Sequence, residues 1–91
     1  MGAGPINGFT VSGAGSASTN GNYDHNGSFN SKPKYTMGTF YIAYLGDFWI
    51  IAGTAGTYYY VASTADYPPL VGWVKSSSAP GVDPPPTLSS Y

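Results

Sequence analysis

The sequence predicts a small all-β fold, a single antiparallel sandwich or partly open barrel of five to seven short strands. Three observations point to this class. The chain has 91 residues, a length typical of one domain with a modest core. Its 13 glycines and 8 prolines interrupt the chain so often that no helix-length apolar period survives. The short runs between them are rich in aromatic and β-branched residues, as strands are.

The first third of the chain offers short β-like runs separated by turn residues. These runs are residues 8–12, 21–25, 28–30 and 33–37. Between the second and third runs, Asn26-Gly27 predicts a type I′ turn, because both residues tolerate a positive φ. Residues 26–28 also match a glycosylation sequon, which a turn explains equally well.

The clearest element is a hairpin spanning residues 39–52. Two apolar runs flank Gly46-Asp47, a two-residue loop that suits a type II′ turn. The resulting register pairs Leu45 with Phe48, Tyr44 with Trp49, Ala43 with Ile50 and Ile42 with Ile51. We expect this hairpin to be the centre of the protein's stability.

Both faces of the predicted hairpin are apolar. One face carries Ile42, Tyr44, Trp49 and Ile51, and the other carries Tyr41, Ala43, Leu45, Phe48 and Ile50. Such a hairpin lies centrally in a sandwich or barrel, or a partner covers its second face.

The second half of the chain becomes richer in proline. Residues 57–61 predict a strand with tyrosines on both sides, residues 62–67 a polar loop, and residues 68–75 an edge strand behind Pro68-Pro69. We divide the chain into a flexible N-terminal arm (1–7), a β domain (8–75) and a Pro-rich C-terminal arm (76–91). That last arm is expected to be extended, and it can dock as a last strand at residues 87–89.

Charge is scarce, and its scarcity excludes several classes of function. Charged residues make up 8% of the chain, Arg and Glu do not occur, and the net charge is −1. Without a basic patch, nucleic acid is a poor partner. Cysteine does not occur, which excludes disulfides and thiolate chemistry. The first five residues lack the basic and apolar regions of a signal peptide, and no run is long enough to span a membrane.

No catalytic constellation is visible, so we expect neither an enzyme nor a cofactor. The single histidine, His25, follows Asp24, but neighbouring strand residues point to opposite faces. A nucleophile, a base and an orienting group do not occur together. With Asn26, these two residues offer at best a weak metal site, and none is expected.

Aromatic side chains are the best candidates for binding. They make up 16% of the chain, and tyrosine suits interfaces because it is amphipathic and loses little entropy. Trp49 is assigned to the core, opposite Tyr44, whereas part of the tyrosine run must face outward. The predicted binding residues are Tyr58, Tyr59, Tyr60, Tyr67 and Trp73.

The order of these runs resembles a known type of module. The matching segments are residues 12–16, 20–23, 26–30, 32–35, 40–42, 49–51, 57–60, 68–69 and 72–73. Together they resemble an uncharacterised small β module of bacterial, phage and metagenomic surface or particle proteins. The resemblance covers about residues 11–89, implies a fold and a context, and implies no site residues.

The leading functional hypothesis is a non-enzymatic structural or adhesive surface protein of a larger assembly, such as a phage head-decoration or tail-associated protein. Its partners would be copies of itself or a larger protein shell or fibre, on a virion or extracellular surface. The alternative is a carbohydrate-binding module that uses exposed Tyr and Trp. Whether Trp49 and Trp73 are buried or line a shared groove discriminates between the two.

Overall fold

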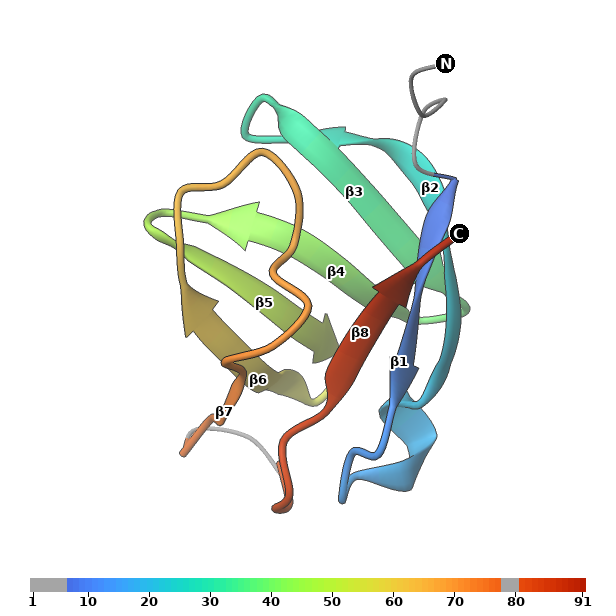
Figure 1. Ribbon diagram of the computed structural model, residues 1–91, viewed down its shortest axis with the longest axis vertical. Coiled ribbons are helices and arrows are strands. Elements are labelled where there is room, and N and C mark those ends of the chain that lie inside the picture. Colours follow the sequence, from blue (N-terminus) through green and yellow to red (C-terminus); the bar gives the residue numbers. More distant parts are fainter. Residues whose placement is uncertain (1–6, 78–80) are drawn as a thin grey trace.

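The protein is an open half-barrel made from one antiparallel sheet, and it is seen here as a computed structural model that describes residues 7–77 and 81–91 (Figure 1). The strand order is β7-β6-β5-β4-β3-β2-β1-β8. In the described residues the only helix is η1, a 3-10 turn of three residues. The elements are β1 (Gly8–Ser12), η1 (Ala17–Thr19), β2 (Gly21–Phe29), β3 (Lys32–Met37), β4 (Phe40–Leu45), β5 (Phe48–Gly53), β6 (Gly56–Ala62), β7 (Val74–Lys75) and β8 (Thr87–Ser90). The all-β prediction is confirmed.

The described chain has eight strands, so the predicted count of five to seven is too low. The end of the Pro-rich arm supplies β8, which pairs with the free edge of β1 from Phe9↔Ser90 to Ser12↔Thr87. An edge strand offers unpaired N–H and C=O groups, and this segment satisfies them. The predicted N-terminal arm lies outside the described residues except for Asn7, whose N–H donates to the Tyr91 carbonyl at 2.8 Å.

The β4–β5 hairpin has the predicted register. Its pairs run from Leu45↔Phe48 to Ile42↔Ile51 and continue to Tyr41↔Ala52. Gly46 has a φ of 65°, whereas Asp47 is not in the left-handed region. This combination agrees with the type II′ turn expected from a Gly-X loop.

The turn predicted at Asn26-Gly27 is wrong. Strand β2 continues through these residues, which form an irregularity in its pairing with β3, and Gly27 takes a φ of 78° there. The chain reverses instead at Asn30-Ser31, with φ values of 55° and 69°. Asn30 tolerates this conformation, and its Nδ2 donates to the Tyr44 carbonyl at 3.0 Å. The later turn lets β2 and β3 pair over a longer stretch.

Most of the predicted edge strand at residues 68–75 is a loop. Only Val74 and Lys75 pair with β6, because Pro68 and Pro69 have no N–H to donate and Gly72 takes a φ of 93°. Residues 63–73, which we call the covering loop, cross the open side of the half-barrel in front of β4 and β5 (Figure 1). The Leu88 N–H of β8 donates to the Leu70 carbonyl at 2.8 Å and ties the loop to the far edge of the sheet.

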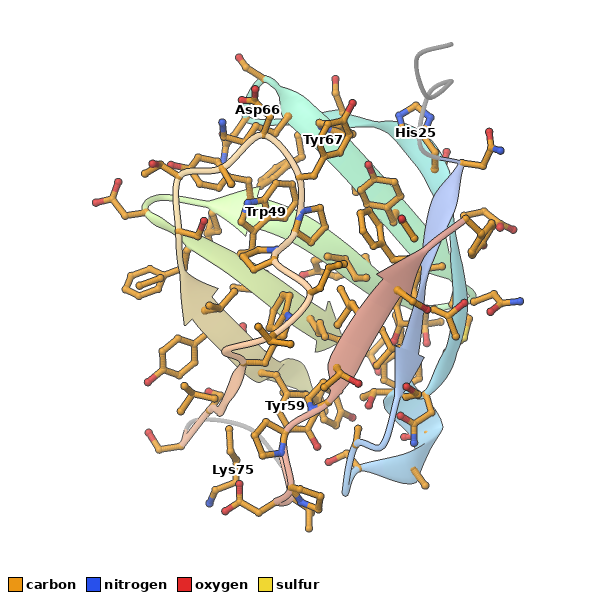
Figure 2. All side chains as sticks on the ribbon, in the orientation of Figure 1. His25, Trp49, Tyr59, Asp66, Tyr67 and Lys75 are labelled. Carbon is orange, nitrogen blue, oxygen red and sulfur yellow. The ribbon has the colours of Figure 1, made fainter. Side chains whose placement is uncertain are left out.

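The core fills the space between the sheet's inner face and the covering loop. Figure 2 shows Trp49 behind this loop and Tyr59 near the base of β8. The hairpin face that carries Ile42, Tyr44, Trp49 and Ile51 is the inner one, since Ile42, Trp49 and Ile51 are fully buried and Tyr44 packs against them, and the assignment of Trp49 to the core is confirmed. The largest fully buried side chains are Trp49, Tyr23, Tyr35, Tyr59, Phe9, Ile42, Ile51 and Val11.

Candidate functional site

The candidate site is the sheet's outer face over the end of β2 and over β3 to β6, which nothing in the described chain covers. Register places its residues in cross-strand rows, because Ala43 pairs with Ile50, Ile50 with Tyr60 and Tyr60 with Val74. Lys34 lies beside Ala43, since the neighbouring residues Tyr35 and Ile42 are paired. We define the outer face by Phe29, Lys34, Tyr41, Ala43, Leu45, Phe48, Ile50 and Tyr60.

Two hollows mark this face, one on either side of Leu45 and Ile50. The first, of about 290 Å³, adjoins Lys34 and Ala43 on β3 and β4. The second, of about 330 Å³, adjoins Phe48 and Tyr60 on β5 and β6. The outer face therefore has a surface relief into which apolar side chains of another molecule can fit.

The floor of the outer face is buried, while its walls project into solvent. Ala43 and Ile50 are only 1% and 7% exposed. Phe29, Leu45 and Phe48 are 42–47% exposed. The Phe48 and Tyr60 rings meet edge to face, with centroids 5.6 Å apart and an interplanar angle of 82°. This contact holds two of the projecting rings in fixed positions.

Charge on the outer face is minimal. Lys34 is the one ionisable side chain other than tyrosine among the residues that line the two hollows. Asp47 lies just beyond the face, in the turn between Leu45 and Phe48. The one ion pair in residues 7–77 and 81–91 joins Lys32 to Asp66, so Lys34 and Asp47 have no charged partner within that part of the chain.

The five aromatic residues singled out in the sequence do not form one patch. Tyr59 and Trp73 are 0% and 4% exposed and belong to the core, where the Trp73 Nε1–H donates to the Pro69 carbonyl at 2.8 Å. Tyr58 is half-buried and packs against the core at Phe40, with ring centroids 5.6 Å apart. Tyr60 lies on the outer face, and Tyr67 projects from the covering loop, as Figure 2 shows. A binding role for the set stays a prediction.

The Tyr59 hydroxyl joins three distant segments instead of facing solvent. It accepts from the Ser16 N–H at 3.0 Å and donates to the Val82 carbonyl at 2.6 Å. The Val82 N–H in turn donates to Ser16 Oγ at 2.9 Å, which closes the ring. These bonds hold the C-terminal segment against β6, so Tyr59 has a structural role.

At the opposite end of the half-barrel, two contacts hold the covering loop in place. Lys32 Nζ lies 3.2 Å from Asp66 Oδ1 and 4.8 Å from the centroid of the Tyr44 ring. The Trp49 Nε1–H donates to the Ala65 carbonyl at 3.0 Å. Exposed surface around Asp66 limits this ion pair to a modest effect, whereas the buried indole bond fixes the loop from beneath.

A buried tyrosine at this end has an unusual environment. The Tyr35 hydroxyl is buried without a hydrogen-bond partner among the described residues. Burial, together with the neighbouring Tyr67, raises the pKa of Tyr35 to about 12. Its ring contacts Phe9 at 4.9 Å and the exposed His25 at 5.7 Å between centroids.

The sequence neighbours Asp24 and His25 do not form a catalytic pair in this arrangement. The Asp24 carboxylate accepts a hydrogen bond from the Tyr91 hydroxyl, while His25 faces Tyr35. In the part of the chain that the structure describes, no cluster of three or more His or Asp side chains is placed to hold a metal ion. Among the same residues no helix is long and apolar enough to cross a membrane.

Comparison with known proteins finds no match to this chain: no family model, no curated protein and no solved structure. The resemblance noted in the sequence therefore stays an expectation. The function has to be argued from the geometry of the outer face.

Sequence reasoning found the central strands of the outer face and missed its margin. It placed Tyr41, Leu45 and Phe48 on one side of the hairpin, but it did not connect Phe29 or Lys34 with them. The signal lay in the next strand pair, because continuing the alternation from β4 into β3 brings Lys34 beside Ala43.

Proposed function

We propose that this protein is a non-enzymatic structural or adhesive protein that works by contact with other protein chains through its outer face. The observation that carries the proposal is the apolar outer face of β3 to β6 and the end of β2, which no described segment covers. Phe29, Leu45 and Phe48 lie on it together, each 42–47% exposed. Soluble chains seldom expose contiguous apolar surface of more than a few hundred Å² unless it binds something.

The chemistry of the face supports a protein partner. With a single lysine among the residues lining its hollows, it has little to steer a charged ligand. Recognition there rests on shape, apolar area and tyrosine hydroxyls, which are the usual means of the buried centre of a protein interface. A larger particle such as a phage head or tail is one setting for such a chain, and that setting stays a prediction.

The carbohydrate alternative loses its main support. Both indoles are buried, with Trp49 bonded to Ala65 and Trp73 to Pro69, so neither offers a ring face to a sugar. The two hollows are lined by no carboxylate or amide side chain, the groups that would fix sugar hydroxyls. These placements favour contact between proteins over sugar binding.

A photo-crosslinking experiment tests the proposal. The photoreactive amino acid p-benzoylphenylalanine replaces Phe48 on the outer face or, as a control, Val71, a 67% exposed residue of the covering loop. Both variants are expressed in cells that carry the native gene, irradiated and analysed by mass spectrometry. We expect protein cross-links from position 48 well above those from position 71.

Glycan-array binding of the unmodified chain is measured alongside. Equal cross-linking at positions 48 and 71, combined with micromolar binding of one sugar class, would overturn the proposal in favour of a carbohydrate module. Equal cross-linking without sugar binding would also reject the outer face as the contact surface.

A further inference from the structure

We infer that the outer face docks against the outer face of a second copy of this chain, in a two-fold pair that places Lys34 of each copy against Asp47 of the other. The inference rests on the proposed function and names its partner. Two features of the outer face carry it, its opposite charges and its matching relief, and the area of the face sets the expected strength of the pair.

The charges lie at two different margins of the face, Lys34 on its outermost full strand β3 and Asp47 at the β4–β5 turn. Lys34 sits beside Ala43, and Asp47 follows Leu45 in the β4–β5 turn. Two residues of β4 and the turn separate these points along the strands, and between one and two strand spacings separate them across the sheet, which together give roughly 12 Å. Both side chains lack a charged partner within the described chain. In a two-fold symmetric pair, a residue i of one copy contacts a residue j of the other, and residue j of the first copy contacts residue i of the second. Lys34 and Asp47 would therefore form two contacts between opposite charges in one interface.

The relief of the face obeys the same symmetry. A two-fold axis that lies between the two sheets and bisects the line from Lys34 to Asp47 places each of these side chains against the other one of the second copy. Phe48, next to Asp47, then projects over the hollow of about 290 Å³ beside Lys34 and Ala43 of the other copy. The axis was defined by the two charged side chains alone, and it also brings Phe48 of one copy to the hollow of the other.

The area sets the strength of the pair. Four strands about 4.8 Å apart and about six residues long span roughly 400 Å² in projection. A standard stable interface takes about 800 Å² from each partner. The pair should therefore be reversible and dissociate on dilution. With a net charge of −1, the copies scarcely repel each other, so weak attraction is enough at high concentration.

Charge exchange tests the pair. Sedimentation velocity of the full chain, from micromolar to near-millimolar concentration, compares the wild type with Lys34→Glu, Asp47→Lys and the double variant Lys34→Glu/Asp47→Lys. Each single change should weaken dimerisation roughly tenfold, because it places like charges opposite each other twice. The double variant should return to within about threefold of the wild type, since the pairs are restored with reversed sign.

Two controls keep the result interpretable. Lys75→Glu changes an exposed lysine on β7 whose cross-strand partner is the inward Tyr59, and it should leave dimerisation unchanged. Thermal melting of each variant establishes that it folds, and Lys34→Gln, expected to weaken the pair about threefold, replaces Lys34→Glu if the latter melts early.

The outcomes separate this inference from the proposed function. A wild-type monomer at all concentrations, or a double variant as weak as the singles, overturns the two-fold pair. In either case, cross-links from position 48 to a different protein would leave the proposed function standing. Equal cross-linking from positions 48 and 71 would remove the proposed function and this inference together.

Discussion

The inner and outer faces of β4 and β5 are built from the same two strands, yet the inner face is covered and the outer face carries exposed side chains. On the inner face, Ile42 and Trp49 are fully buried beneath residues 63–73 and β8. On the outer face, Leu45 and Phe48 of the same strands are 47% and 42% exposed. Apolar alternation alone does not distinguish the two faces. What differs is whether irregular segments of the chain lie on top, and over the outer face none of the described segments does.

The largest expected effect comes from truncating the inner face. Ile42→Ala should lower the free energy of unfolding by about 2–5 kcal/mol, because it leaves a cavity in a packed core. Ile50→Ala should cost about 2 kcal/mol, at the low end, since neighbours cover Ile50 on one side only. Leu45→Ala should cost less than about 1 kcal/mol. Urea unfolding of dilute protein measures all three, and equal losses would mean that the outer face is covered by something in the monomer.

Hydroxyl removal on the inner face gives a second contrast. Tyr59→Phe leaves the Ser16 N–H and the Val82 carbonyl without their buried partner and should cost about 1–3 kcal/mol. Tyr35→Phe removes a hydroxyl that has no partner among the described residues, so it should be neutral or stabilising. Thermal and urea unfolding compare the two. A larger loss from Tyr35→Phe would mean that its hydroxyl is bonded after all.

Phenols whose pKa values are raised in the folded state should make the fold sensitive to alkali. Burial raises the pKa of Tyr35 to about 12, and burial together with Asp24 raises that of Tyr91 to about 12. Between pH 10 and 12 the unfolded phenols lose protons that the folded ones keep, so stability falls as the pH rises through this window. Stability measured by urea unfolding from pH 9 to 12 should fall less steeply in Tyr35→Phe. An unchanged slope in that variant would contradict the assignment to Tyr35.

The smallest effect is expected at the exposed fastening of the covering loop. Asp66→Asn removes the ion pair with Lys32, and the Asp66 side chain is 89% exposed. The change should cost about 0.2–1 kcal/mol. Acrylamide quenching of Trp fluorescence should stay unchanged, because the Trp49 indole still donates to the Ala65 carbonyl. A marked rise in quenching would show that the ion pair, and not the buried bond, holds the loop.

Local rules were enough to predict the β4–β5 hairpin. Gly46-Asp47 specifies a two-residue turn, and once the turn is placed, alternation sets the register and both faces. The same rules put a turn at Asn26-Gly27, where the strand instead continues and reverses at Asn30-Ser31. The error arises because several Asn and Gly positions tolerate positive φ, and the choice among them depends on how long β2 and β3 can pair.

Long-range pairing was beyond such rules. Strand β8 and the covering loop take their places by bonds to β1 and to each other, and the bond from Leu88 to Leu70 spans parts of the chain with no common local pattern. For the same reason, the five aromatic residues predicted to bind do not lie on one surface. The Tyr59 hydroxyl bonds to Ser16 and Val82, and the Trp73 indole bonds to Pro69 of the covering loop. Alternation does not reveal these partners.

Side-chain labelling of the two faces tests the central claim most directly. Hydroxyl-radical labelling with mass spectrometry would compare the dilute chain with its associated fraction, residue by residue, at Leu45, Phe48, Ile42 and Trp49. We predict that Leu45 and Phe48 label strongly in the dilute chain and become protected on association, whereas Ile42 and Trp49 stay protected in both. Equal labelling of Leu45 and Phe48 in the two states would contradict the account, because the outer face would then remain open in the assembled protein.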